Sequence, residues 1–430
     1  MNRFRIGVGK IWSAAFFASG LTLTAIADPG SIVTVDNHGF SLPRLNAIGN
    51  KIDGDVKNAL LPGAVLLVAR DGKLVYAHVA GMQDVKAAQP MRRDSIFRIH
   101  SLTKPIVSVA AMVLVEEGKL ALADPASKYL PELKNLQVGV ERRDTAGAIS
   151  LELAPAMREM TVHDLLRHTA GLTYAFVGKS LVKDEYQKLG LDGVNESSAE
   201  WILKLAKTPL QSQPGSRWEY GVATDVLGVI LERVSGQSLD AFLAGKIFRP
   251  LKMNDTAFTV EPSKQARIAE PFEIDSVWKV KTPMSDPRKT PPRFSGGGGL
   301  LSTADDYLRF VQMLLNGGEL DGARILAPKT VELMLADNLP VMRIAAPPGQ
   351  IILGPRPGYG FGLGFAVRTD VGGANTPGSI GIADWNSISG TNFWIDPKEK
   401  LAVVWMMQAP GLRPYYRQVI ANMVYAAMVK

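Results

Sequence analysis

Strand-forming segments at both ends of the chain, with helix-forming segments between them, constrain the fold more than any other sequence feature. Residues 62–70 and 73–79 are apolar runs joined by Asp71-Gly72, a pair typical of tight hairpins. Near the other end, residues 361–368, 391–395 and 401–408 are strand-like. We therefore predict an α+β (mixed α/β) fold. One antiparallel sheet is built from both chain termini and flanked by helices, and a mostly helical subdomain is inserted at roughly residues 120–290.

The first 27 residues have the pattern of a secretory signal peptide. A basic start precedes an apolar run from residue 11, and Ala25-Ile26-Ala27 offers a small-x-small cleavage site before Asp28. The sequence thus predicts a periplasmic or secreted protein whose mature chain, residues 28–430, is a single domain. The alternative is an uncleaved membrane anchor, the one case in which a membrane partner is expected. The chain has no cysteine, which excludes disulfides and thiol catalysis.

Charge and motif patterns exclude several other classes. The net charge of +7 is mild and spread along the chain, so no nucleic-acid partner is expected. His163 and His168 lie five residues apart, not the four of a helical zinc pair, and we predict no metal site and no cofactor. Residues 296–299 are four glycines without a following Lys-Ser/Thr, which indicates a tight turn beside another backbone rather than a phosphate loop.

The strongest chemical signal is Ser101-Leu102-Thr103-Lys104, at the start of a long apolar helix. Positions i and i+3 share a helix face, so the serine hydroxyl and the lysine amine can meet. A desolvated lysine has access to its neutral form and can take the hydroxyl proton, which turns the serine into a usable nucleophile. Ser180 and Ser276 also have a lysine three residues later. Neither of them, however, follows a strand and opens a long helix.

Four further segments strengthen the case for Ser101. Together with the Ser-x-x-Lys motif they resemble the serine β-lactamase-like superfamily, specifically the class C β-lactamase and family VIII carboxylesterase branch. The resemblance runs from about residue 43 to the C-terminus. The segments that carry it are residues 166–173, 220–228, 294–304 and 390–396.

The resemblance implies a role for each matching position. Ser101 would be the nucleophile, Lys104 its proton partner, and Tyr220 the group that exchanges protons with Ser101 and the leaving group. The oxyanion hole would be formed by the backbone N–H groups of Ser101, at the helix start, and Ile388, on a strand. The third motif of the family, Lys-Thr-Gly or Trp-Gly-Gly, falls on residues 385–387.

Three changes depart from the β-lactamase pattern. Val222 stands where β-lactamases place an asparagine, and Trp385 stands where they place a lysine, so the substrate-binding groups at both positions are apolar. Asn386-Ser387 departs even from the glycine pair of the esterases. The first two changes favour neutral, apolar acyl esters over β-lactams, and the third leaves the effect on turnover open.

The sequence as a whole predicts an exported serine hydrolase that cleaves small-molecule carboxylic esters through a covalent acyl-serine. A β-lactamase or D-amino-acid peptidase with a divergent third motif is an alternative. So is a non-catalytic module that binds cell-wall ligands. The natural ester, its acyl chain length, the balance between hydrolysis and acyl transfer, and the oligomeric state are not determined by the sequence.

Overall fold

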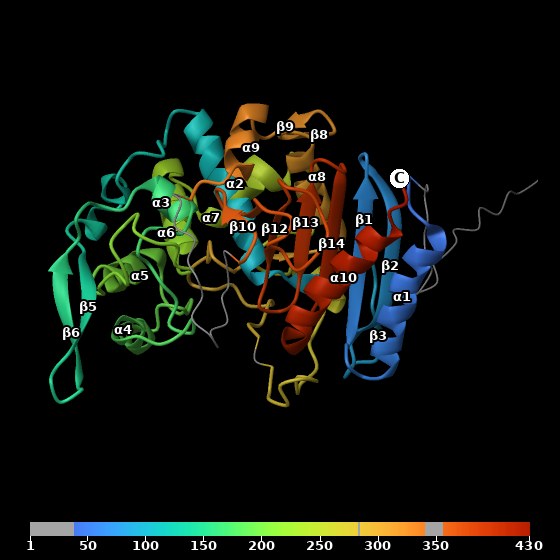
Figure 1. Cartoon of the computed structure of the whole chain (residues 1–430), viewed down its shortest axis with the longest axis horizontal. Coiled ribbons are helices and arrows are strands. Elements are labelled where there is room, and N and C mark those ends of the chain that lie inside the picture. The colour runs from blue at the N-terminus through green and yellow to red at the C-terminus, as the bar shows by residue number, and fades with distance from the viewer. Residues whose placement is uncertain (1–37, 283, 340–355) are drawn as a thin grey trace, which may run out of the picture.

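A computed structural model describes residues 38–282, 284–339 and 356–430 of the chain (Figure 1). The predicted signal segment lies outside these residues. Within them, no helix is long and apolar enough to cross a membrane.

An eight-stranded antiparallel sheet forms the centre of the molecule, as the sequence predicted. Its order is β10-β11-β12-β13-β14-β1-β2-β3, so the last long strand of the chain pairs with the first, with Leu67 opposite Val404. The predicted turn at residues 71–72 joins β1 to β2, and residues 396–400 join β13 to β14 in the same way. The strands are β1 (Gly63–Arg70), β2 (Lys73–Asp84), β3 (Gln89–Pro90), β10 (Tyr359–Phe361), β11 (Ala366–Arg368), β12 (Ala383–Asn386), β13 (Asn392–Asp396) and β14 (Leu401–Met407).

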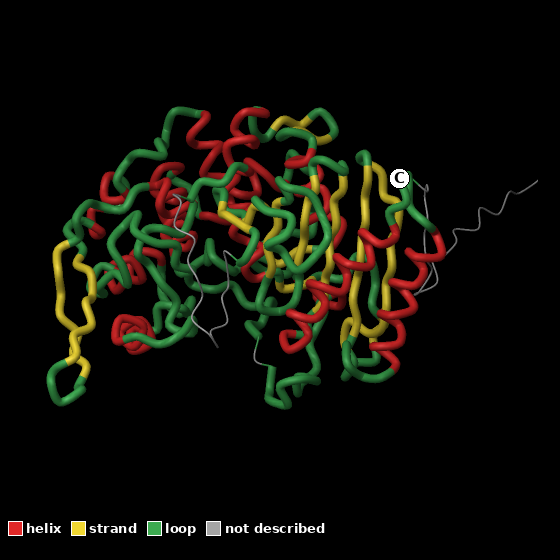
Figure 2. Tube along the Cα trace, viewed as in Figure 1, coloured by secondary structure: helices red, strands yellow, loops and turns green. Residues whose placement is uncertain are grey.

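Helices cover both faces of this sheet (Figures 1 and 2). Because side chains alternate along a strand, Leu66 and Val68 of β1 face one layer and Val65 and Leu67 face the other. The first layer contains α1 (Leu42–Lys57) and α10 (Arg413–Ala427), which also contact each other. The second contains α2 (Thr103–Glu116) and α8 (Ala304–Leu315). The catalytic candidate Ser101 therefore lies in the second layer.

Between α2 and α8 the regular structure is mostly helical, with much of the chain in loops, and two of the helices begin at a capping box. Thr161 and Ser197 each start a capping box, in which the side chain of the third helical residue bonds back to the cap. Gly236 ends α6 in the left-handed conformation. The helices are α3 (Val162–Leu166), α4 (Leu181–Leu189), α5 (Ser198–Leu205), α6 (Ala223–Ser235) and α7 (Leu239–Leu243), and α9 (Pro328–Leu335) follows α8.

Two features differ from the sequence predictions. The helical part contains an exposed hairpin, β5 (Gln137–Arg143) and β6 (Ile149–Pro155), which was not predicted although Ile149, Leu151 and Leu153 alternate with polar residues. Residues 361–368 form parts of two strands, because Gly364 has φ +95° and turns the chain between β10 and β11. Short pairs join β4 (Phe97–Arg98) to β7 (Leu301–Ser302) and β8 (Glu319–Leu320) to β9 (Ala323–Arg324).

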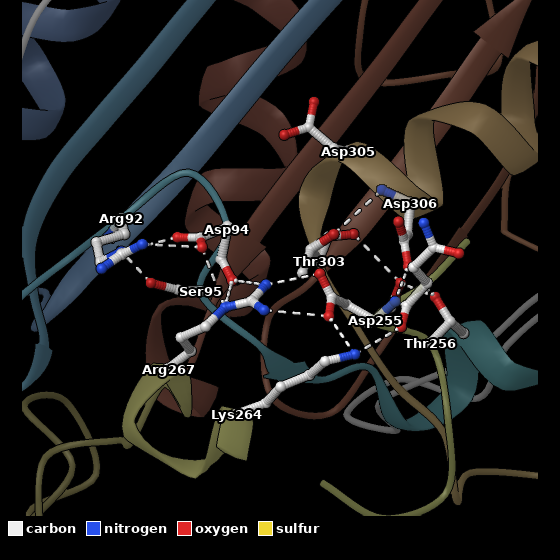
Figure 3. Close-up of polar contacts among 12 residues, drawn as sticks. Arg92, Asp94, Ser95, Asp255, Thr256, Lys264, Arg267, Thr303, Asp305 and Asp306 are labelled. Atoms are coloured by element: carbon white, nitrogen blue, oxygen red, sulfur yellow. Dashed lines mark hydrogen bonds and ion pairs between the residues drawn. The ribbon is translucent and has the colours of Figure 1, made fainter. Parts of the chain in front are cut away.

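A polar network fastens the segment before β4 to the start of α8 (Figure 3). The Asp306 carboxylate accepts hydrogen bonds from the Asp255 backbone N–H at 2.7 Å and the Thr256 hydroxyl at 2.9 Å. Arg267 pairs with Asp255 and donates to the backbone carbonyl of Asp94. Burial raises the pKa of Asp306 to about 6. This network stabilises the framework that holds β4, the strand leading to Ser101.

Candidate active site

Ser101 lies in a single turn of 3₁₀ helix (His100–Leu102) between β4 and α2. Two contacts fix this turn. The Tyr307 hydroxyl donates to the Leu102 carbonyl at 3.0 Å, and the Thr103 hydroxyl accepts from the backbone N–H of Leu300 at 3.1 Å. Ser101 therefore precedes the first α-helical turn, and its side chain is half-buried.

The other two serines with a lysine at i+3 have ordinary structural contacts. The Ser180 hydroxyl caps α4 by accepting from the Lys183 backbone N–H at 3.1 Å. The Ser276 hydroxyl donates to the Leu60 carbonyl at 2.6 Å. Only Ser101 lies beside a tyrosine and a buried lysine.

Tyr220 makes the direct contact with Ser101. Its hydroxyl donates a hydrogen bond to Ser101 Oγ at 2.7 Å. The ring is 4% exposed and is packed by aromatic neighbours, among them His168 at 5.1 Å and Trp385 at 5.5 Å between ring centroids. This packing leaves the phenol group little freedom to turn away from Ser101.

Lys104 is buried behind the serine and reaches the site through Tyr220. Its Nζ donates to the Tyr174 hydroxyl at 3.1 Å and to the Gly297 carbonyl at 2.5 Å. Nζ also lies 4.7 Å from the centroid of the Tyr220 ring. Within the described residues it has no hydrogen bond to Ser101. The expected serine–lysine contact is thus replaced by a serine–tyrosine contact with the lysine next to it.

Tyr174 and Asp225 extend this arrangement into the helical part. The Tyr174 hydroxyl lies 3.4 Å from Asp225 Oδ2, to which it donates. Asp225 also accepts from Arg293 at 3.1 Å and from the Ser295 hydroxyl at 2.6 Å. Burial, followed by the nearby Asp225 charge, raises the pKa of Tyr174 well above its ordinary value. Tyr174 therefore stays protonated and can both accept from Lys104 and donate to Asp225.

The glycine run at 296–299 makes this arrangement possible. A side chain at Gly296 would lie 2.5 Å from the Thr224 carbonyl, and one at Gly297 would lie 2.2 Å from Asp225 Oδ2. The predicted close approach to another backbone is therefore confirmed at Gly296. Its consequence at Gly297, an acceptor for the lysine, was not foreseen.

Two histidines near the serine are neutral, His168 buried and His100 half-buried. Burial, with a smaller effect of Lys104, lowers the pKa of His168 well below its ordinary value. Burial and the Arg98 charge lower the pKa of His100 to about 4. Neither has a hydrogen bond to Ser101 among the described residues. The structure therefore assigns the proton contact with Ser101 to Tyr220, and His168 to the packing around that ring.

Ile388 lies in the turn between β12 and β13, whereas the sequence placed it on a strand. The strand ends at Asn386 because Gly390 turns the chain and bonds back to the Ser387 carbonyl at 3.2 Å. The side chain of Ile388 is 45% exposed. A turn N–H can serve an oxyanion as well as a strand N–H, provided that the turn is held in place.

Buried hydroxyls hold this turn. Ser387 Oγ lies 2.8 Å from Ser389 Oγ and 2.6 Å from Thr391 Oγ1. Ser389 in turn donates to the Arg98 carbonyl at 3.0 Å. Arg98 ends β4, so the network links the Ile388 turn to the strand that leads to Ser101.

The two predicted substrate-binding positions differ in their surroundings. The Trp385 indole packs against Tyr220 and against Phe361, at 5.4 Å, beside the serine. Val222 precedes α6 and is 1% exposed, with its side chain in the main apolar core. An apolar residue therefore suits the packing at 222, and Trp385 brings apolar surface to Tyr220.

Metal-ligating residues are not grouped in the part of the chain that the structure describes: no three His, Asp or Glu side chains there lie together in a way that would hold a metal ion. At Ser101, a hydroxyl that can act as a nucleophile lies beside a phenol and a buried amine. Such a set can form and break an acyl bond.

Comparisons with known proteins agree with this geometry. The model of the β-lactamase family matches residues 48–427. Esterase EstB of Burkholderia gladioli is 34% identical over 399 residues, which cover 86% of this chain and 93% of EstB. An uncharacterised protein of Mycobacterium tuberculosis (strain CDC 1551 / Oshkosh) is 39% identical over 358 residues, with 81% and 86% covered. The solved structure of EstCE1, described as a hydrolase with promiscuous acyltransferase activity, has a TM-score of 0.70 at 25% identity and covers 90% of this chain and 98% of its own.

The fold and the site define a serine hydrolase of the carboxylesterase type with the β-lactamase fold. The chain belongs to the β-lactamase family.

Proposed function

We propose that this protein is an exported carboxylesterase that cleaves small-molecule esters through a covalent acyl-serine. The observation that carries the proposal is the 2.7 Å hydrogen bond between Tyr220 and Ser101, with the buried Lys104 beside the tyrosine ring. A phenol in contact with the nucleophile can both remove and return its proton. The positive charge of Lys104, 4.7 Å from the ring centroid, attracts the negative charge that develops on the phenol oxygen during this exchange.

The proposed reaction has two halves. Tyr220 first releases its hydroxyl proton to solvent; Ser101 Oγ then attacks the ester carbonyl, and the serine proton passes to the Tyr220 oxygen. The tetrahedral oxyanion accepts hydrogen bonds from the N–H groups of Ser101 and Ile388. Tyr220 then donates the proton to the leaving alkoxide as the C–O bond breaks, which releases the alcohol. Water attacks the acyl-serine by the same route and releases the acid.

Covalent labelling tests this proposal. A fluorophosphonate probe should label the wild type, and Ser101→Ala should abolish both labelling and the hydrolysis of nitrophenyl esters. Ser180→Ala and Ser276→Ala are matched controls with the same lysine spacing, and both should leave labelling and turnover intact. Ester hydrolysis by Ser101→Ala well above background would refute the assignment.

The substrate class follows from Trp385 and Val222. A β-lactam presents a carboxylate and an acylamide, for which these side chains offer neither a cation nor an amide. A hydrogen bond to a charged group contributes roughly 1.5–3 kcal/mol and a neutral one about 1. Losing both contacts should lower the rate with a β-lactam by roughly a hundredfold or more. Short acyl esters should therefore exceed nitrocefin by at least about two orders of magnitude in kcat/KM. Equal values would favour the β-lactamase alternative.

Acyl transfer to an alcohol is a second candidate, favoured by the acyltransferase activity named for EstCE1. An alcohol that displaces water in the second half-reaction would yield a new ester. Incubation of the enzyme with a nitrophenyl ester and a primary alcohol separates the outcomes. Transfer predicts the new ester among the products, and hydrolysis alone predicts only the acid.

A further inference from the structure

A cavity lies between the central sheet and α10, and of the described residues that the candidate site uses, Trp385 is the one that also lines it. The cavity has a volume of about 280 Å³, and its described lining does not include Ser101, Lys104 or Tyr220. One wall is the sheet, where Asp384 of β12 is paired with Trp394 of β13. The opposite wall is α10, which crosses the sheet in front of these strands (Figure 1). The helix contributes Pro414, Arg417, Gln418, Ala421 and Tyr425, positions that share one helix face.

The charged groups of this cavity leave one positive charge unbalanced. Arg356 and Asp384 form an ion pair and neutralise each other. Arg417 also lines the cavity and has no ion pair among the described residues. Burial, followed by repulsion from Arg356, lowers the pKa of Arg417 to about 10, so the guanidinium remains charged at neutral pH. Arg417 is half-buried, and a charge partly removed from water without a partner favours an anion beside it.

Unpaired polar atoms accompany that charge. Trp394 and Asn392 both line the cavity and are 6% and 5% exposed. Trp394 Nε1, a donor, and Asn392 Oδ1, an acceptor, are buried, and neither has a well-aligned hydrogen bond among the described residues, although Trp394 lies close to the Tyr425 hydroxyl. Leaving such groups unpaired costs free energy that a ligand with a matching acceptor and donor would recover.

We propose that this cavity binds a small aromatic carboxylate that also carries a hydroxyl donor. The carboxylate would pair with Arg417 and accept from Trp394, and the hydroxyl would donate to Asn392. Flat surface for a ring is available, because Trp394 and Tyr425 stack with centroids 6.4 Å apart. The volume lies just below the ~300–1,000 Å³ usual for ligand pockets, which fits a single-ring compound.

Three single-ring probes test the proposal by titration calorimetry at neutral pH. They are 4-hydroxybenzoate, benzoate, which lacks the hydroxyl, and 4-hydroxybenzamide, which lacks the carboxylate charge. We expect 4-hydroxybenzoate to bind most tightly. Arg417→Gln should weaken the binding of both carboxylates by roughly tenfold or more and the binding of the amide by less than about twofold, since only the carboxylates pair with the guanidinium. Arg249→Gln, an exposed arginine that does not line the cavity, is the matched control and should change nothing.

A cavity-filling variant tests the location. Ala421 is 9% exposed and lines the cavity, so Ala421→Leu should abolish binding of all three probes while the thermal unfolding transition is retained. None of the probes is an ester, so the result does not depend on the proposed catalysis at Ser101. Three outcomes would overturn the proposal: no saturable binding of 4-hydroxybenzoate below about 10 mM, equal losses for carboxylate and amide in Arg417→Gln, or binding that survives in folded Ala421→Leu.

Discussion

Gly297→Ala should disable the site without unfolding the protein. The added methyl group would lie 2.2 Å from Asp225 Oδ2 and 2.8 Å from the Tyr174 hydroxyl. Ordinary contacts of this kind begin near 3.4 Å, so one partner must move by about an ångström. Asp225 is held by Arg293 and Ser295, so we expect residue 297 to move instead.

That movement would carry away an acceptor of Lys104. The Gly297 carbonyl accepts from Lys104 Nζ at 2.5 Å, and Nζ lies 4.7 Å from the Tyr220 ring. A displacement of about 1 Å in a catalytic arrangement can cost about 10² in rate, whereas overpacking in a core costs roughly 1–3 kcal/mol of stability. We therefore expect kcat for a nitrophenyl ester to fall by about 10² and the thermal midpoint to fall by only a few degrees.

The neighbouring glycine supplies the control. A methyl group at Gly298 would have its nearest neighbour, the backbone carbon of His100, at 3.8 Å, which is ordinary contact. Gly298→Ala should therefore keep kcat within about threefold of wild type. Similar kcat values for the two variants would show that the position of the 297 carbonyl does not matter to Lys104, and would refute the reasoning.

Three further predictions concern proton transfer, pH and export. Tyr220→Phe and Lys104→Ala should each lower kcat by at least ~10², and the double variant should lose far less than the product of the two because they act on one proton; multiplied losses would contradict the shared path. Asp306 has its pKa raised to about 6 in the folded protein, so its contribution to stability is largest below about pH 4 and is lost as pH rises through 6. Relative to wild type, the free energy of unfolding of Asp306→Asn, measured with urea, should therefore rise by up to about 3 kcal/mol between pH 4 and pH 7. A difference between the two proteins that stays constant over this pH range would contradict the prediction. N-terminal sequencing of the exported protein should begin at or near Asp28, and an intact first segment in membranes would favour the anchor.

The architecture was accessible from sequence because its signals are local. A capping box needs only residues three apart, as at Thr161 and Ser197. The joining of both chain ends in one sheet followed from apolar strands at each end. The hairpin of β5 and β6 was missed although its sequence carries a strand signal, since Ile149, Leu151 and Leu153 alternate with polar residues. The prediction of a mostly helical insert overrode that short alternating run.

The residues of the candidate site also fall into two groups, those with a local sequence signal and those that only the fold brings together. Ser101 and Lys104 are three residues apart, and a family motif supplied Tyr220. Tyr174 and Gly297 meet Lys104 across separations of 70 and 193 residues, and no periodicity reports contacts of that range. A partial signal existed for both: Tyr174 directly follows the 166–173 motif, and Gly297 lies within the glycine run.

The most informative departure from the family pattern is Ser387, which stands where the esterases have glycine. Its hydroxyl contacts those of Ser389 and Thr391, and Ser389 donates to the carbonyl of Arg98. The residues around the Ile388 N–H are therefore tied to the strand that ends just before Ser101. A glycine in that turn would bring only backbone freedom. Here, buried hydroxyl contacts fix one proposed oxyanion donor relative to the nucleophile, so the substitution is compatible with a working site.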